Sequence, residues 1–244
     1  MFRKSILILW WRRLKKALLI LFVFQFFYII ALKWINPPIT LTQLSDWVSG
    51  YGLKRDYVDF DEMSPNIRLA VMASEDQLFP DHNGFDIASI KKALSSNKKK
   101  TKRIRGASTI SQQVAKNVFL WQGRSWFRKG LEVYFTFMIE LVWSKQRILE
   151  MYLNVAEMGK GIYGVEAASQ SYFKKPAKKL TRSEAAMIAA CLPNPKKYTV
   201  KPQSRYIARR YPWIVTQMNN LEGDEDIDQF LVKKEPVKVK KKKK

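Results

Sequence analysis

The sequence predicts a mainly α-helical protein in which one N-terminal transmembrane helix precedes the folded body. Three observations support this prediction. An apolar run lies near the N-terminus, helix-capping and helix-ending residues recur through the rest of the 244-residue chain, and strands do not alternate with helices. The length is typical of one domain or slightly more, and it leaves enough chain to bury a core after a membrane segment is subtracted.

The apolar run reads ALLILFVFQFFYIIAL from Ala17 to Leu32, and only Gln25 in it is polar. It extends to residue 35 if the one lysine reaches the interface, which gives roughly 28 Å of helix against a ~30 Å bilayer core. A cleaved signal peptide and a buried core helix are the alternatives. No small-x-small cleavage site follows the run, and the next residues, KWINPP, are bulky and rigid. We therefore expect a retained transmembrane helix over residues 17–35.

The charges beside this run predict its orientation. Residues 1–16 carry six lysines and arginines and no acidic residue, whereas residues 36–50 carry no lysine or arginine. By the positive-inside rule, residues 1–16 form a cytoplasmic basic segment. Everything after residue 35 is then expected on the outer side of the membrane.

The net charge of +23 comes from three segments and not from a basic domain. Residues 1–16 carry +6, residues 91–105 carry +8, residues 233–244 carry +7, and the remainder carries +2. A nucleic-acid-binding face is therefore not expected. The single Cys191 and the single His82 exclude an intrachain disulfide, cysteine-based zinc sites and histidine-rich metal sites. An enzyme with this composition works with carboxylates, amides and cations.

Beyond the span, composition divides the chain into a linker, a domain and a tail. Residues 36–60 begin near a Pro-Pro pair and are expected to be an extended linker, with one strand at the β-favouring cluster of residues 57–60. Residues 61–222 contain the helix signals and form the folded domain. Residues 223–244 are acidic and then lysine-rich, which is typical of a disordered charged tail.

Capping and stop signals place seven helices in the domain. Ser64 is an N-cap followed by proline at the first helical position. Thr181 and Glu184 have capping-box spacing, and Gly159 is a stop signal. The predicted helices cover residues 64–77, 108–119, 126–142, 144–158, 165–173, 181–193 and 204–219, the last with a kink at Pro212.

The densest group of reactive side chains is EDQLFPDHNGFD, from Glu75 to Asp86. A carboxylate at a helix end beside a loop faces a cleft readily, and partial burial there raises its pKa toward that of a general base. An ordinary solvated helix end followed by a turn is the alternative, and composition alone favours it.

Two further groups follow along the chain. GASTISQQVAKN, from Gly106 to Asn117, offers a glycine, hydroxyls and amides at a helix start, which suits sugars or a diphosphate; the alternative is a plain capped polar helix. In RKGLE, Arg128 and Glu132 are an i,i+4 pair, which by itself indicates only a surface ion pair. Two separated carboxylates, Glu75 and Glu132, nevertheless make the arrangement that glycosyl transfer needs.

These residues stand in the order of the motifs of peptidoglycan glycosyltransferases, and over residues 64–198 the chain resembles this family, glycosyltransferase family 51. Four multi-residue motifs in the right order are a specific signal. The segments GIYGVEAASQSYF and LPNPKKY most resemble the monofunctional biosynthetic transglycosylases. The motifs are Glu75-Asp76-x-x-Phe79-x-x-His82-x-Gly84, Gly106-x-Ser108-Thr109-Ile110-x-Gln112-Gln113, Arg128-Lys129-x-x-Glu132 and Arg147-Ile148-Leu149-Glu150-x-Tyr152-Leu153-Asn154.

The resemblance implies a lysozyme-like helical domain with a membrane-dipping smaller lobe, which polymerises lipid II into β-1,4-linked glycan strands. It also implies that this domain lies on the periplasmic or outer face of the cytoplasmic (inner) membrane. Glu75 resembles the general base that deprotonates the acceptor 4-hydroxyl. Glu132 resembles a second carboxylate at the diphosphate of the donor. The reaction inverts C1 of the donor sugar and releases undecaprenyl diphosphate.

The remaining site residues are assigned by the same resemblance. Lys116, Arg128, Lys129 and Arg105 are expected as cationic partners of the diphosphates. Ser108, Thr109, Gln112 and Gln113 are expected to line the cleft, and Asp76, Phe79 and His82 complete the substrate-binding set. The motif residues Ile148, Leu149, Tyr152 and Asn154 are expected to be architectural and to hold the helix of Glu132.

No cofactor is required by this chemistry and no protein metal site is expected, although the resemblance allows a divalent cation, Mg²⁺ or Mn²⁺, beside the diphosphate. The expected partners are lipid II, the growing glycan strand and the membrane, and then other cell-wall synthases and division proteins. Nucleic acid is not expected. Ala107 stands where the family commonly has a second glycine, which leaves the conformation of that loop open.

Two other functions remain open from sequence. A lysozyme-like glycan hydrolase shares the fold and the catalytic glutamate, but cleavage of an uncharged glycosidic bond does not need the cationic motif residues. A catalytically silent membrane scaffold of cell-wall synthesis is the other, and the presence of both carboxylates argues against it.

Overall fold

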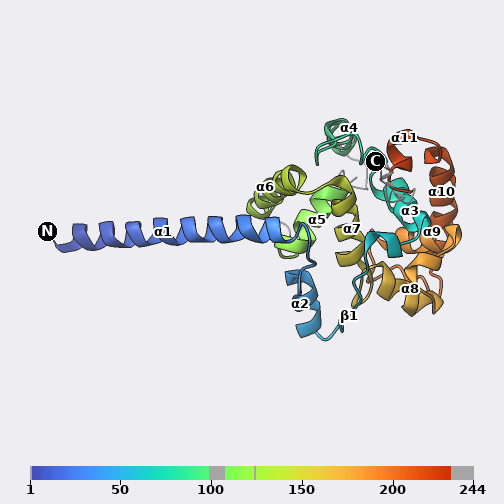
Figure 1. Ribbon diagram of the computed structural model, residues 1–244, viewed down its shortest axis with the longest axis horizontal. Helices are drawn as coiled ribbons and strands as arrows, with labels where there is room; N and C mark the ends of the chain where they lie inside the picture. The colour runs from blue at the N-terminus through green and yellow to red at the C-terminus, as the bar shows by residue number, and fades with distance from the viewer. Residues whose placement is uncertain (1, 99–107, 124, 232–244) are drawn as a thin grey trace, which may run out of the picture.

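The computed structural model describes residues 2–98, 108–123 and 125–231. It is mainly helical, as the sequence predicts: one long helix, α1, leads into a helical body (Figure 1). Helix α1 spans Phe2–Ala31, and its part from Leu9 to Ala31 is long and apolar enough to cross a membrane. The helix therefore starts earlier and ends four residues sooner than the expected span of 17–35.

The C-terminal end of α1 is fastened to the body. The indole Nε1 of Trp143 donates to the carbonyl of Ile29 at 2.8 Å. The guanidinium of Arg147 donates to the carbonyls of Leu32 and Ile35 at 2.7 to 3.1 Å. Because these carbonyls lie in the last turn of α1 or in the four residues after it, the two side chains fasten the C-terminal end of the helix.

The prediction of an extended linker is wrong for part of residues 36–60. Helix α2, Leu41–Val48, begins after Thr40, whose side chain and that of Gln43 form a capping box. This Thr-x-x-Gln signal is present in the sequence. The strand β1 lies at Lys54–Arg55 and not at residues 57–60, because Val58 pairs with the side chain of Asn154 and Phe60 starts a 3₁₀ turn, Phe60–Glu62.

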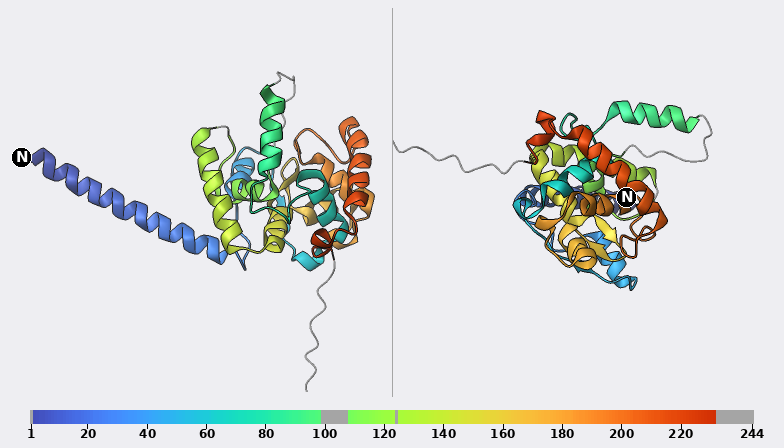
Figure 2. Two further views of the ribbon diagram at one scale, coloured as in Figure 1. Left: turned by 90° about the horizontal axis from the view of Figure 1, so that it is seen from above. Right: turned by 90° about the vertical axis from the view of Figure 1, so that its right-hand side faces the viewer.

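The core of the body is a helical bundle around α3 (Figures 1 and 2). Helix α3, Pro65–Glu75, packs against α9, Arg182–Cys191, and α10, Arg205–Leu221. Helix α5, Ile110–Phe119, packs against α6, Trp126–Val142, and α7, Lys145–Val155. The capping residues Ser64, Thr109, Ser125, Ser144, Thr181 and Ser204 each accept a hydrogen bond from the first turn of their helix, which explains why the predicted starts are nearly correct.

A small sheet closes one end of the bundle. Strand β3, Ile162–Tyr163, pairs parallel to β1 and antiparallel to β2, Glu157–Gly159. The helix expected over residues 144–158 therefore ends at Val155. Helix α8, Val165–Phe173, and the 3₁₀ turn Ala177–Lys179 follow the sheet.

Two further segments differ from the sequence prediction. Helix α4, Ile87–Lys98, was not predicted; it stands away from the body in Figure 2. Helix α11, Glu225–Asp228, lies in the segment expected to be disordered, which is wrong up to residue 231. Ile227 and Phe230 are buried there, and the carbonyl of Phe230 accepts from buried Arg68 at 2.9 Å, so this stretch belongs to the core.

Candidate active site

Three neighbouring cavities form a continuous polar cleft in the body. The first, of about 330 Å³, contains Glu75. The second, of about 150 Å³, contains Glu132 and shares Ser108 with the first. The third, of about 400 Å³, shares Gln113 and Lys116 with the second and reaches β2 and the turn at Pro193–Lys196. The structure thus brings both predicted carboxylates to one cleft, with Ser108 between them.

Glu75 is the last residue of α3 and lines the first cavity. Its Oε2 accepts a hydrogen bond from the amide Nε2 of Gln113 on α5 at 2.8 Å. Burial raises the pKa of Glu75, and the Gln113 hydrogen bond and the charges of Arg210 and Lys116 lower it by smaller amounts. A carboxylate with a raised pKa, held by a neutral donor and open to a cavity, is suited to accept a proton.

The amide of Gln113 is itself oriented from α7. The hydroxyl of Tyr152 donates to Gln113 Oε1 at 3.3 Å, which leaves Nε2 directed at Glu75. Burial raises the pKa of Tyr152 well above its ordinary value, so the phenol keeps its proton. Tyr152 was expected to support the helix of Glu132; in the structure it supports Gln113 and so Glu75.

Glu132 lies on α6 in the second cavity and is almost fully buried. Its carboxylate accepts from Arg128 Nη1 at 2.8 Å and from the Lys129 ammonium. These residues are i,i+4 and i,i+3 neighbours, so one helix builds the group. The carboxylate neutralises only part of the charge, because Lys116 from α5 also lines the cavity.

The second cavity is therefore electropositive. Three cations and one carboxylate line it, a net charge of +2. The structure gives Lys116 no carboxylate within ion-pair distance among the described residues, and burial lowers its pKa. The buried Nε of Arg128 also has no hydrogen-bond partner there. Such unpaired donors suit an anion with several oxygen atoms, such as a diphosphate.

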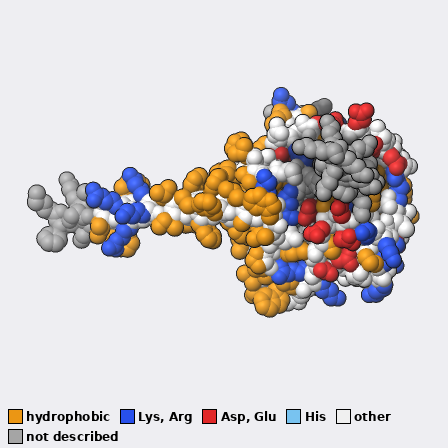
Figure 3. Space-filling view, viewed as in Figure 1, with side chains coloured by type: hydrophobic (Ala, Val, Ile, Leu, Met, Phe, Trp, Pro, Cys, Tyr) orange, Lys and Arg blue, Asp and Glu red, His pale blue; other side chains and the backbone are white. Residues whose placement is uncertain are grey.

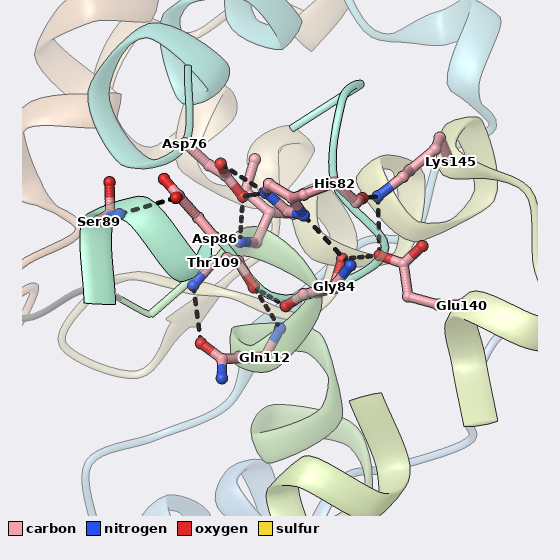
Figure 4. Close-up of polar contacts among 11 residues, drawn as sticks. Asp76, His82, Gly84, Asp86, Ser89, Thr109, Gln112, Glu140 and Lys145 are labelled. Carbon is pink, nitrogen blue, oxygen red and sulfur yellow. Dashed lines mark hydrogen bonds and ion pairs between the residues drawn. The ribbon is translucent and has the colours of Figure 1, made fainter. Parts of the chain in front are cut away.

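Asp76, which also lines the first cavity, and His82 connect the elements around the cleft through hydrogen bonds (Figure 4). The Asp76 carboxylate accepts from the backbone N–H of Ile110, the first residue of α5, at 2.9 Å and from His82 Nε2 at 3.0 Å. The N–H of Gly84 donates to His82 Nδ1 at 3.2 Å. His82 lines none of the three cavities, so substrate binding by its side chain stays a prediction.

Phe79 also lies outside the linings of the three cavities. Its side chain is fully buried, with the ring centroid of Phe230 at 5.9 Å and the Lys145 ammonium over its face at 4.7 Å. Lys145 also reaches the carbonyl of His82 and the carboxylate of Glu140 (Figure 4). Phe79 therefore anchors the loop after α3 to α7 and to the segment after α11, and substrate binding by its side chain stays a prediction.

The other predicted residues divide into two groups. Thr109 and Gln112 form the capping box of α5, and Thr109 Oγ1 donates to the carbonyl of Gly84 at 2.7 Å, so their side chains hold the helix start at the cleft wall. Ser108 is exposed and lines both the first and the second cavity. Arg105 lies outside the described residues.

The structure adds Trp213 of α10, which the sequence did not indicate, to the lining of the first cavity. The Arg210 guanidinium lies over its indole ring at 3.8 Å from the centroid. In the sequence, Trp213 stands one helical turn after Arg210 on an amphipathic helix. This spacing is only a weak indication that the tryptophan lines a binding site.

Within the described part of the chain, no three His, Cys, Asp or Glu side chains come close enough together to hold a metal ion. Among the described residues that line the second cavity, Glu132 is the only carboxylate, and two cations already engage it. These residues therefore do not form a divalent-cation site by themselves.

The chain is similar in sequence to known proteins. Residues 42–219 match the family model described as Transglycosylase. Proteins named biosynthetic peptidoglycan transglycosylase from Shigella boydii and Escherichia coli are each 58% identical over 185 residues, which cover 75% of this chain and 76% of theirs. One of that name from Yersinia pseudotuberculosis is 58% identical over 184 residues, 74% of this chain and 76% of its own. The motifs, the helical fold and these matches together show that the chain belongs to the transglycosylase family.

Proposed function

We propose that this protein is a peptidoglycan glycosyltransferase that polymerises lipid II into β-1,4-linked glycan strands and releases undecaprenyl diphosphate. The observation that carries the proposal is that two adjoining cavities present different groups. One presents a carboxylate with a raised pKa beside a neutral amide, and the other presents three cations around a buried carboxylate. Family membership and the names of the relatives support the same activity.

In this proposal Glu75 acts as the general base. The acceptor sugar lies in the first cavity, where Trp213 offers an apolar face and Glu75 reaches the 4-hydroxyl. The hydroxyl oxygen attacks C1 of the donor sugar, its proton passes to Glu75, and the bond from C1 to the diphosphate oxygen breaks. Because the attacking and leaving oxygens lie on opposite sides of C1, the configuration inverts.

The second cavity stabilises the leaving group. Lys116, Arg128 and Lys129 direct their donors at an oxygen-rich anion, and they are preorganised because Glu132 holds two of them. The leaving diphosphate is already anionic, so it does not need a strong general acid. A divalent cation between Glu132 and the diphosphate would need oxygens from the substrate as further ligands.

The proposal also places the protein at a membrane. We assign α1 as a retained single-pass anchor in the cytoplasmic (inner) membrane, with the N-terminus in the cytoplasm and the body on the outer face. Apolar side chains continue from α1 onto the adjoining side of the body (Figure 3). Helix α6 adds a row of exposed apolar side chains, Trp126, Phe127, Val133, Phe137 and Leu141. Such a row is unfavourable in water and favourable against lipid.

The test is to incubate the detergent-solubilised protein with lipid II, with and without divalent cation, and to resolve the products by length. A transferase lengthens glycans, a lysozyme-like hydrolase shortens added strands, and a scaffold does neither. Lys116→Met is expected to lower kcat by on the order of 10²-fold, as loss of one preorganised transition-state donor does. Lys160→Met, an exposed cation outside the three cavities, is the matched control.

A further inference from the structure

An apolar groove of about 320 Å³ lies between α1 and the body, apart from the polar cleft. One wall is a stripe of α1 formed by Leu21, Phe24 and Tyr28, which are spaced as one helix face. The opposite wall comes from α2, α5 and α6. Its lining there includes Leu41, Leu44, Val118, Phe119 and Phe135.

Aromatic rings form much of the groove surface and connect its walls. The ring of Tyr28 meets that of Phe119 edge to face at 6.2 Å, and Phe119 stacks on Phe135 with centroids 4.7 Å apart. Leu41 and Leu44 on the other side remain exposed in the absence of a partner. The groove is therefore preformed, apolar and open on one side.

The groove lies along the part of α1 that is able to span a membrane. Leu21 and Tyr28 lie inside the segment of α1 that is able to span a membrane, and seven residues of helix extend about 10 Å. Tyr28 is three residues from the end of α1, and Leu21 is deeper. The groove thus runs along the proposed anchor, from its outer end into the outer leaflet.

The groove also begins next to the electropositive cavity. On α5, Lys116 lines the cavity and Phe119 lines the groove; on α6, Glu132 lines the cavity and Phe135 lines the groove. Each pair is i,i+3, so on both helices about 4.5 Å of helix rise separates the anion site from the apolar site. A molecule that joins a diphosphate directly to a long hydrocarbon chain fits both at once.

We infer that this groove binds the first isoprene units of the polyprenyl chain attached to the donor diphosphate. The inference rests on the proposed function and deepens it, because it gives the chain, and not only the diphosphate and sugars, a site on the protein. Binding of the chain would place C1 of the donor beside Glu75 and would favour long-chain substrates over short-chain ones.

The first experiment compares kcat/KM for lipid II with a full-length and with a much shortened prenyl chain, in detergent micelles. Leu44→Trp and Leu21→Trp fill the groove from α2 and from α1. Val48→Trp and Leu19→Trp add the same bulk to the same helices at exposed positions outside it. The groove-filling variants are expected to lower kcat/KM for the long-chain substrate at least about tenfold, and for the short-chain substrate less than about twofold.

Equal losses with both substrates, or equal behaviour of groove and control variants with the long-chain substrate, would overturn the inference. Polymerisation of the short-chain substrate by the wild type separates this failure from that of the proposed function, since that reaction does not need the groove.

The second experiment detects the chain directly and does not depend on turnover. A photoreactive polyprenyl diphosphate is cross-linked to the full-length protein, and the labelled peptides are identified. Labelling within residues 21–28 and 41–44 that an unlabelled prenyl diphosphate suppresses, and phosphatidylglycerol vesicles do not, is expected. Equal suppression by phosphatidylglycerol would overturn the inference in favour of a general lipid contact, and labelling elsewhere would overturn it altogether.

Discussion

Glu75 and Glu132 are the same residue type in two different surroundings, and their neighbours support the different roles proposed for them. Glu75 has a neutral hydrogen-bond donor and a raised pKa. Glu132 is buried between two cations. Their motifs indicated both carboxylates, but not the connection from Tyr152 through Gln113 to Glu75, because that contact joins α7, α5 and α3, whose relative placement no local pattern encodes.

This connection predicts a change in the pH dependence of activity. The base must be ionised, so kcat/KM falls as the pH drops through the pKa of Glu75. The Gln113 hydrogen bond lowers that pKa, and Gln113→Leu removes it, so the acid limb of the profile shifts to higher pH. Tyr152→Phe should shift it less in the same direction. Tyr172→Phe, whose hydroxyl bonds the remote carbonyl of Met158, should not shift it; identical profiles for all four proteins would refute the connection.

The raised pKa of Glu157 predicts that the stability of the fold depends on pH. Burial raises the pKa of Glu157 from 4.5 to about 7, despite Lys196 at 3.9 Å. The folded state then binds this proton more tightly than the unfolded state does. The contribution of Glu157 to the unfolding free energy is therefore most favourable below pH 4.5, decreases between pH 4.5 and 7, and is level above.

The slope from one such group is at most about 1.4 kcal/mol per pH unit. Chemical denaturation of the wild type and Glu157→Gln across this range is the measurement, and the variant should lack this component. Parallel stability profiles for the two proteins would show that Glu157 titrates normally.

At the scale of elements, helices with a polar N-cap are predicted well and short elements poorly. The capped helices α3, α5, α6, α7, α9 and α10 start within a few residues of their predicted positions. Strands of two or three residues carry no periodic pattern, so β1, β2 and β3 could not be predicted. Helix α2 could have been found from its Thr-x-x-Gln capping box, and α4 from Asp86, whose carboxylate accepts from the N–H of Ser89 at 2.8 Å.

The loop between α3 and α4 depends on one glycine. Gly84 has φ of +85°, and a Cβ there would lie 2.7 Å from Thr136 Cγ2 on α6. Gly84→Ala is expected to lower the unfolding free energy by about 2 to 4 kcal/mol, from left-handed backbone strain and overpacking together. Gly50→Ala, with φ of +75° and no neighbour within 4 Å, isolates the backbone part at about 1 to 2 kcal/mol.

Thermal or urea unfolding measures these differences. Thr136→Ser removes the clashing methyl and keeps the hydroxyl that donates to the carbonyl of Glu132 at 2.6 Å, so it should partly restore the Gly84→Ala variant. Equal losses for the two glycine variants would rule out the contact with α6.

At the scale of the whole molecule, composition distinguished the segments of the chain but did not predict the contacts between them. The sequence identified the apolar helix, the helical body and the basic segments from which the charge of +23 arises. It did not predict that Arg147 and Trp143 fasten the end of α1 to the body, or that Ile227 and Phe230 bring the segment after α10 into the core. These are contacts between residues more than 100 positions apart, and their partners are backbone carbonyls that any sequence supplies.

The attachment of α1 to the body has a consequence for activity. In the proposed function α1 spans the bilayer that holds the substrate, and its attachment to α7 then keeps the cleft at a constant distance from that bilayer. Arg147→Met removes four hydrogen bonds to the end of α1 and to Asn36, and it should lower the polymerisation rate on substrate in vesicles more than in detergent micelles. Equal losses in both would indicate only a destabilised fold.

The most direct test of the central claim is lipid II polymerisation by the full-length protein in detergent, wild type beside Glu75→Gln, with the strands resolved by length. Glutamine has nearly the shape of glutamate but cannot accept the proton at neutral pH. The account predicts glycan strands from the wild type and none from an equally folded Glu75→Gln variant. Strands of normal length and yield from Glu75→Gln would contradict it, because another group would then have to act as the base.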